Sequence, residues 1–122
     1  MARILCVDDE PGVLTLKCSI LEAEGHQVAA CLSAADAVQR LQAQAYDLVI
    51  TDWRLGGESG QAVVEAAKAR PAMPVIVVSG FLAEAEGARP SADLYLEKPL
   101  HPKRLVEAVN RLLQKGAKGA AG

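Results

Sequence analysis

The sequence predicts an α/β protein with a doubly wound (βα)5 architecture around a parallel five-stranded sheet. Short runs of Val, Ile and Leu alternate along the chain with stretches that have helical spacing. Strands that alternate with helices run parallel and are joined by right-handed crossovers. The predicted strands are apolar along their whole length, and this indicates a sheet that is covered by helices on both faces.

Local signals place the elements of the first half. The runs that predict strands are residues 3–7, 27–32 and 47–51. A helix over residues 12–24 is expected to end at Gly25. Its inward-facing residues are predicted to be Val13, Leu16, Ile20 and Leu21. The next helix follows Ser33, which forms a capping-box pattern with Asp36.

The second half continues the alternation. Strands are predicted at residues 74–79, the most β-branched run in the chain, and at 93–96. Helices are predicted at residues 60–70, 81–88 and 102–115, of which the second is short and weak. The chain is therefore expected to form one domain of ordinary size over residues 1–115. Residues 116–122, GAKGAAG, are expected to be a flexible tail or the start of a linker.

Composition excludes several function classes. The 122 residues carry a net charge of −2, with acids and bases spread along the chain. This leaves no basic footprint for direct nucleic-acid binding and no polybasic patch for a membrane. No apolar run approaches the roughly 20 residues that span a bilayer, so a cytoplasmic location is expected. The three cysteines lack metal-ligand spacing and are expected to be small core or near-core residues.

Polar side chains gather where the predicted strands end. Ligands of open α/β sheets bind outside the carboxyl ends of the strands. The residues at these ends are Asp8 and Asp9 after the first strand, Asp52 after the third, Ser79 after the fourth and Lys98 after the fifth. In a strand order of 2-1-3-4-5, three carboxylates, a hydroxyl and an ammonium group would converge at one edge.

This set of groups suits metal-assisted phosphoryl transfer. Two carboxylates about 4 Å apart repel by roughly 4 kcal/mol at a protein-like dielectric, and a hard cation offsets that repulsion. Mg²⁺ prefers such oxygen ligands and keeps several waters. Lys98 adds a cationic clamp and Ser79 a hydrogen-bond donor. A carboxylate can itself be the nucleophile and form an acyl phosphate.

The chain resembles the receiver domain of two-component response regulators, which has a flavodoxin-like fold, over about residues 3–115. The matching residues, in order, are Asp8, Asp9, Asp52, Gly60, Ser79, Tyr95 and Lys98-Pro99. Each of these matches is weak alone, but together, in order and at matching intervals, they are highly specific.

The resemblance implies a role for each residue. Asp52 would accept a phosphoryl group from a sensor histidine kinase or a phosphotransfer protein. Mg²⁺, or Mn²⁺, would be held by Asp9, Asp52 and the carbonyl of Arg54, with Asp8 acting through a coordinated water. Lys98 would pair with the phosphoryl oxygens.

The resemblance also implies how the signal would leave the site. Ser79 and Tyr95 would switch position and change the surface made by the fourth helix, fifth strand and fifth helix. The domain would catalyse its own phosphorylation and dephosphorylation while acting mainly as a signalling switch.

The segment DWRLGGESG departs from the family pattern. It has Leu55-Gly56 where the family more often has Met-Pro, and its two glycines predict a more mobile loop. Trp53 is expected either to pack under this loop or to lie over it. Arg54 and Phe81 are predicted to tune the lifetime of the phosphorylated state. The weak helix at 81–88 makes the family's familiar dimer doubtful, so at most a weak homodimer is expected.

Other interpretations stay open. A degenerate receiver would keep the fold as a phosphorylation-independent binding module. A hydrolase with an aspartyl nucleophile usually has a second acid two residues later, where this chain has Arg54. A flavin carrier would need a phosphate-cradling loop after the first strand. Asp8 and Asp9 could simply cap a helix, and Tyr95 could simply pack on the sheet. By the resemblance, a downstream effector would contact the changed surface.

Overall fold

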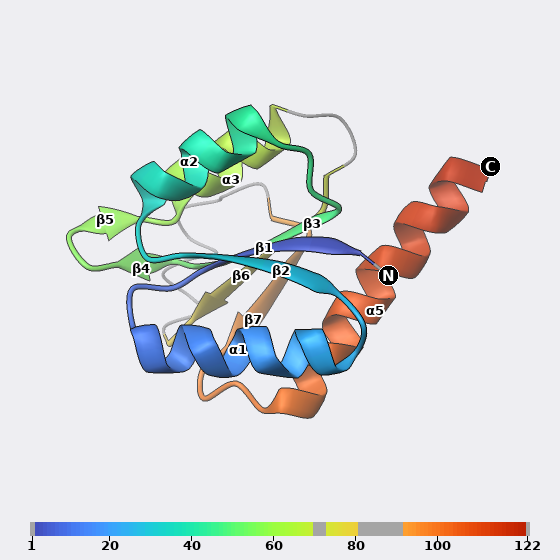
Figure 1. The fold of residues 1–122 in the computed structure, drawn as a ribbon, viewed down its shortest axis with the longest axis horizontal. Coiled ribbons are helices and arrows are strands. Elements are labelled where there is room, and N and C mark those ends of the chain that lie inside the picture. Colours follow the sequence, from blue (N-terminus) through green and yellow to red (C-terminus); the bar gives the residue numbers. More distant parts are fainter. Residues whose placement is uncertain (1, 70–72, 81–91, 122) are drawn as a thin grey trace.

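A single parallel sheet forms the centre of the fold. The computed structural model describes residues 2–69, 73–80 and 92–121. The sheet has the order β2-β1-β3-β6-β7, so the predicted order 2-1-3-4-5 is confirmed, with β6 and β7 as the predicted fourth and fifth strands (Figure 1). The strands are β1 (Arg3–Val7), β2 (Gln27–Cys31), β3 (Leu48–Asp52), β6 (Val75–Ser79) and β7 (Leu94–Glu97).

Helices cover both faces of this sheet. They are α1 (Pro11–Ala23), α2 (Ala34–Ala43), α3 (Gln61–Lys68) and α5 (Pro102–Ala121). Helices α2 and α3 lie together on one face, and α1 and α5 lie on the other (Figure 1). Local signals set the ends: Ser33 Oγ accepts a hydrogen bond from the Asp36 amide at 3.1 Å, and Gly25 takes a φ of 92° after α1.

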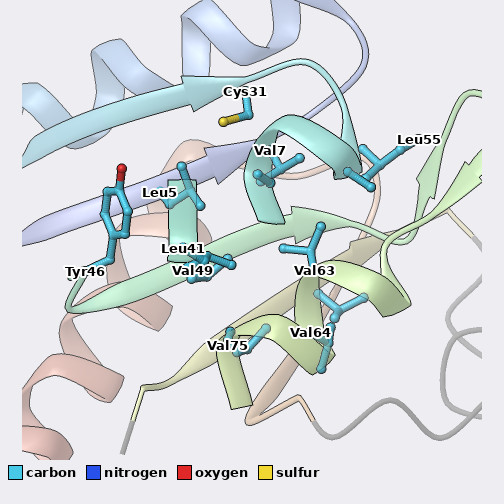
Figure 2. Close-up of a cluster of buried hydrophobic side chains, with 14 of the residues drawn as sticks. Leu5, Val7, Cys31, Leu41, Tyr46, Val49, Leu55, Val63, Val64 and Val75 are labelled. Atoms are coloured by element: carbon cyan, nitrogen blue, oxygen red, sulfur yellow. The ribbon is translucent and has the colours of Figure 1, made fainter. Parts of the chain in front are cut away.

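The face under α2 and α3 is closed by a continuous apolar cluster (Figure 2). Strand residues Leu5 and Val49 meet Leu41 of α2 and Val63 of α3 in this cluster. Two of the few aromatic side chains in the chain, Tyr46 and Trp53, are also buried there. We call this set of residues the α2/α3-side cluster.

The face under α1 and α5 has its own core but one charged member. Its buried residues include Ile4, Ile50 and Leu105. Helix α1 buries Leu14, Lys17 and Leu21, whereas Leu16 is 58% exposed. The prediction that Leu16 faces inward was therefore wrong. Adjacent helical residues are about 100° apart around the axis, so a stripe through residues 14, 17 and 21 turns residue 16 outward.

The segment after β3 forms a small antiparallel ribbon that the sequence analysis missed. Strands β4 (Arg54–Leu55) and β5 (Glu58–Ser59) pair across a turn at Gly56, whose φ is 64°. Leu55 points into the α2/α3-side cluster, and Trp53 is buried in the same cluster. Trp53 thus packs into the core beneath the segment, which decides between the two orientations left open.

Two of the helices predicted in the second half of the chain need comment. The predicted helix at 81–88 lies outside the described residues. Helix α5 continues to Ala121, beyond the predicted end at Lys115; the role of residues 116–122 as a tail or linker stays a prediction. Within the part of the chain that the structure describes, every helix is too short or too polar to cross a bilayer.

Candidate functional site

The candidate site lies at the carboxyl edge of the sheet. Asp52 is the last residue of β3, and Ser79 is the last residue of β6. Asp8 directly follows β1, and Lys98 directly follows β7. Because β3 lies between β1 and β6, Asp52 is at the middle of this group.

The three predicted carboxylates come together. Asp8, Asp9 and Asp52 each offer an oxygen that lies within 4.8 Å of the others. The carboxyl groups of Asp8 and Asp52 are buried, whereas Asp9 is exposed. Asp8 Oδ1 accepts a hydrogen bond from the Glu10 amide at 2.9 Å, which fixes its orientation. An oxygen-rich group with one open side is the kind of site that a hard divalent cation prefers.

Lys98 contacts the central carboxylate from the solvent side. Its Nζ donates to Asp52 Oδ2 at 2.8 Å, and its side chain is 39% exposed. The Lys98 amide donates to the carbonyl oxygen of Ser79 at 2.8 Å, and the Lys98–Pro99 peptide bond is cis. The structure thus brings Asp52, Ser79 and Lys98 to adjacent strand ends, as the strand order predicted.

A second lysine, which the sequence analysis missed, contacts the same carboxylates from beneath. Lys17 Nζ lies 2.9 Å from Asp8 Oδ2 and 3.2 Å from Asp52 Oδ1, and its side chain is only 5% exposed. Its signal in the sequence is position: Lys17 stands three residues after Leu14 and four before Leu21, inside an apolar helical stripe. A lone lysine in such a stripe indicates a buried acidic partner.

These contacts shift the pKa values of the buried groups. Burial acts to raise the pKa of Asp8, but the Glu10 amide and Lys17 outweigh it and lower that pKa from its ordinary value. Burial raises the pKa of Asp52, against the attraction of Lys17 and Lys98. Burial acts to lower the pKa of Lys17, but Asp52 and Asp8 raise it overall. Lys17 therefore carries its charge inside the protein.

The backbone of Asp52 is held by its neighbours. The Thr51 hydroxyl donates to the carbonyl oxygen of Asp52 at 3.0 Å. The Gly60 amide donates to the carbonyl oxygen of Trp53 at 2.6 Å. A Cβ at position 60 would overlap the carbonyl oxygen of Asp52. Only glycine fits this close approach, which gives a physical reason for the glycine eight residues after Asp52.

The remaining predicted residues lie at different distances from this centre. Ser79 is buried, and Tyr95 on the adjacent strand β7 is half-buried against the α2/α3-side cluster. Arg54 is exposed in β4, where it pairs with Ser59. Phe81 lies outside the described residues.

With this geometry established, the family model of the response regulator receiver domain matches residues 4–110. The chain belongs to the response regulator receiver family. The receiver domain is 29% identical to a CheY-like receiver protein from Methanospirillum hungatei JF-1, with a TM-score of 0.89 and 98% of each chain covered. The prediction of this family and of its fold is confirmed.

Curated relatives place similar domains in longer proteins. The receiver domain is 34% identical to the transcriptional regulatory protein GlrR of Escherichia coli K12 over 95% of this chain and 27% of that protein. It is 31% identical to the sensor protein GacS of Pseudomonas syringae pv. syringae over 88% of this chain and 13% of that protein. The chain thus spans about a quarter or less of the length of these two relatives.

Proposed function

We propose that this receiver domain is a phosphorylation-activated switch in which Asp52 accepts a phosphoryl group from a sensor histidine kinase or a phosphotransfer protein. The observation that carries the proposal is the buried Asp52 carboxylate at the end of the central strand, with Lys98 on one oxygen and two further carboxylates beside it. A degenerate binding module would have no need of this complete set.

The chemistry assigned to the chain's own residues is in-line transfer to oxygen. An Asp52 oxygen bonds to phosphorus as the P–N bond to the donor imidazole breaks, and the electron pair stays on the imidazole. Lys98, which already donates to Asp52, is placed to pair with the negative oxygens of the incoming group. Asp52 itself is buried, which limits the access of bulk water to its carboxylate before transfer.

The acidic cluster fits a divalent cation, Mg²⁺ or Mn²⁺, because its donors are all carboxylate oxygens within 4.8 Å of one another. Asp9, Asp52 and the Arg54 carbonyl would hold it, with Asp8 acting through a coordinated water. When bound, the cation supplies charge neutralisation for the phosphoryl oxygens.

The proposed output runs through Ser79 and Tyr95 to the surface around β7 and α5. Ser79 ends β6 directly beside the strand that carries Tyr95, and its carbonyl is tied to Lys98. A new phosphoryl group near Lys98 would draw the Ser79 hydroxyl, and Tyr95 would follow toward the interior. Arg54 and Phe81 are proposed to tune the lifetime of the phosphorylated state. A cytoplasmic location and an effector contacted without direct nucleic-acid binding belong to the same proposal.

The test uses a small phosphodonor and the intrinsic fluorophore. Trp53, the one tryptophan in the chain, is next to Asp52. Incubation with Mg²⁺ and acetyl phosphate, or with a beryllofluoride mimic, is expected to change Trp53 fluorescence. Acetyl phosphate is expected to add the mass of one phosphoryl group.

The Asp52→Asn variant is the matched control, since it keeps the shape of the side chain but removes the nucleophile. It is expected to keep the fold by circular dichroism and to take up no phosphate. Absence of both the fluorescence change and the added mass in the wild type would leave the binding-module interpretation in its place.

A further inference from the structure

The buried lysine of α1 contacts two of the three carboxylates that would hold a divalent cation. Lys17 Nζ donates to Asp8 Oδ2 and Asp52 Oδ1, and these two residues supply two of the three carboxylates of the candidate cation site. An ammonium group so placed already offsets the repulsion between the buried carboxylates. Its positive charge thus stabilises the paired carboxylates as a bound cation would, without any ion from solution.

Simultaneous contact of Lys17 and a divalent cation with the carboxylates of Asp8 and Asp52 is strongly disfavoured. Mg²⁺ requires near-octahedral oxygen ligands at about 2 Å and retains waters around it, so it would need room beside the carboxylates that Lys17 now contacts. An ammonium group within hydrogen-bond distance of the same carboxylates would also repel the cation. Since Lys17 is attached to α1, it is present at a high effective concentration and cannot be diluted away.

The structure also provides room for the lysine to withdraw. A cavity of about 290 Å³ adjoins Lys17 and is lined by Glu10, Leu16, Lys98 and Leu105 among others. The four-carbon stem of a lysine can swing its ammonium group within such a space. Glu10, at the amino end of α1, would offer it a carboxylate there.

We propose that Lys17 is a built-in counter-ion of the acidic pocket, which competes with Mg²⁺ for Asp8 and Asp52 and sets the metal affinity of this receiver domain. The inference rests on the proposed cation site and adds to it a residue outside the set that the family resemblance assigns. Lys98 differs in kind, because among the described carboxylates it pairs with Asp52 and not with Asp8, through the other oxygen and from a half-exposed position.

The first experiment compares Mg²⁺ dissociation constants by isothermal titration calorimetry, with Trp53 fluorescence as a second readout. Lys17→Met removes the charge but keeps an unbranched side chain of similar length. It is expected to bind Mg²⁺ about tenfold more tightly than the wild type, or more, because the competing charge is gone. Lys103→Met makes the same change of net charge at an exposed position of α5 and is expected to stay within about twofold of the wild type.

A second measurement uses the wild type alone, so that it does not depend on the variant folding. The buried, hydrogen-bonded ammonium protons of Lys17 are expected to give an observable ¹H–¹⁵N signal in lysine-labelled protein without metal. Saturation with Mg²⁺ is expected to shift that signal or broaden it beyond detection as Lys17 leaves the carboxylates.

The outcomes separate the two proposals. If the wild type and Lys17→Met bind Mg²⁺ equally, or the Lys17 signal is unchanged at saturation, the competition is refuted while the cation site stands. If neither protein binds Mg²⁺, both the competition and the proposed cation site are refuted.

Discussion

The two faces of the sheet are built differently. Under α2 and α3 the core is an apolar cluster that includes Tyr46 and Trp53, and the ion pair of α2 between Arg40 and Asp36 lies on the exposed surface. Under α1 and α5 a charged lysine reaches the carboxylates at the strand ends, and a cavity adjoins it. Both faces bury the same sheet, and among the described residues it is the second that places a buried charge, that of Lys17, against the site carboxylates.

One face therefore stabilises the fold by packing, and the other places charges near the site carboxylates. The α2/α3-side cluster holds the backbone of β3 in place by packing, and packing of this kind is insensitive to ions. The α1 side adds charges whose balance would change on the proposed binding of a cation or a phosphoryl group. Truncations within the α2/α3-side cluster that leave Trp53 and Tyr95 intact should therefore alter stability alone, and substitutions around Lys17 should also alter the response to ligands.

The largest expected effect comes from matched leucine truncations on the two faces. Leu41→Ala in α2 removes a side chain that is 1% exposed and should cost about 2–5 kcal/mol in the free energy of unfolding, measured with urea. Leu14→Ala, one turn before Lys17, should cost a similar amount. Only Leu14→Ala is expected to tighten Mg²⁺ binding, by a few-fold, because it loosens the helix that carries Lys17. Equal changes of Mg²⁺ affinity in both variants would contradict the division between the faces.

A smaller effect concerns the pH dependence of stability on the α2/α3 side. Burial raises the pKa of the Cys31 thiol from 9.0 to about 12. The unfolded chain then releases this proton from about pH 9 upward while the folded protein retains it, so the stabilising contribution is complete below pH 9 and is lost as pH rises toward 12.

Comparison with Cys31→Ala isolates this thiol. The stability difference between the wild type and the variant should shrink by about 1 kcal/mol between pH 8 and pH 10, measured by urea unfolding at each pH. A difference that does not change with pH would mean that the thiol ionises in the folded protein as easily as in the unfolded chain. The α2/α3 side would then be more open to water than its packing indicates.

The smallest expected effect is that of the exposed ion pair. Arg40 Nε lies 3.7 Å from Asp36 Oδ2, four residues earlier on α2, and both side chains are more than 40% exposed. Arg40→Met should lower the free energy of unfolding by about 0.5 kcal/mol or less in urea titrations. A loss above about 1.5 kcal/mol would show that charge supports this face as well.

The sequence was sufficient for the features that depend on strand order. Asp8, Asp52, Ser79 and Lys98 each stand at or just after the end of an apolar run, and the parallel order brings those ends together. The position of Lys17 required knowledge of how α1 is rotated. An error of one residue, about 100°, placed Leu16 inside and left Lys17 unnoticed.

The ribbon of β4 and β5 was missed for a different reason. Each of its strands has only two residues, which is too short for a periodic pattern, and its two glycines were read as a sign of mobility. Its burial depends on Leu55 and Trp53 meeting residues from distant parts of the chain. Contacts of that kind have no local signature.

The central position of β3 has a consequence for how the domain opens. The strand pairs with β1 on one side and with β6 on the other, and all five of its residues are buried. Its amide protons are therefore expected to exchange with solvent only on global unfolding. In the proposed mechanism, the phosphoryl-accepting Asp52 is therefore attached to a fully buried central strand. Phosphorylation of Asp52 would then change side chains and loops beyond the strand ends while the central strand keeps its pairing.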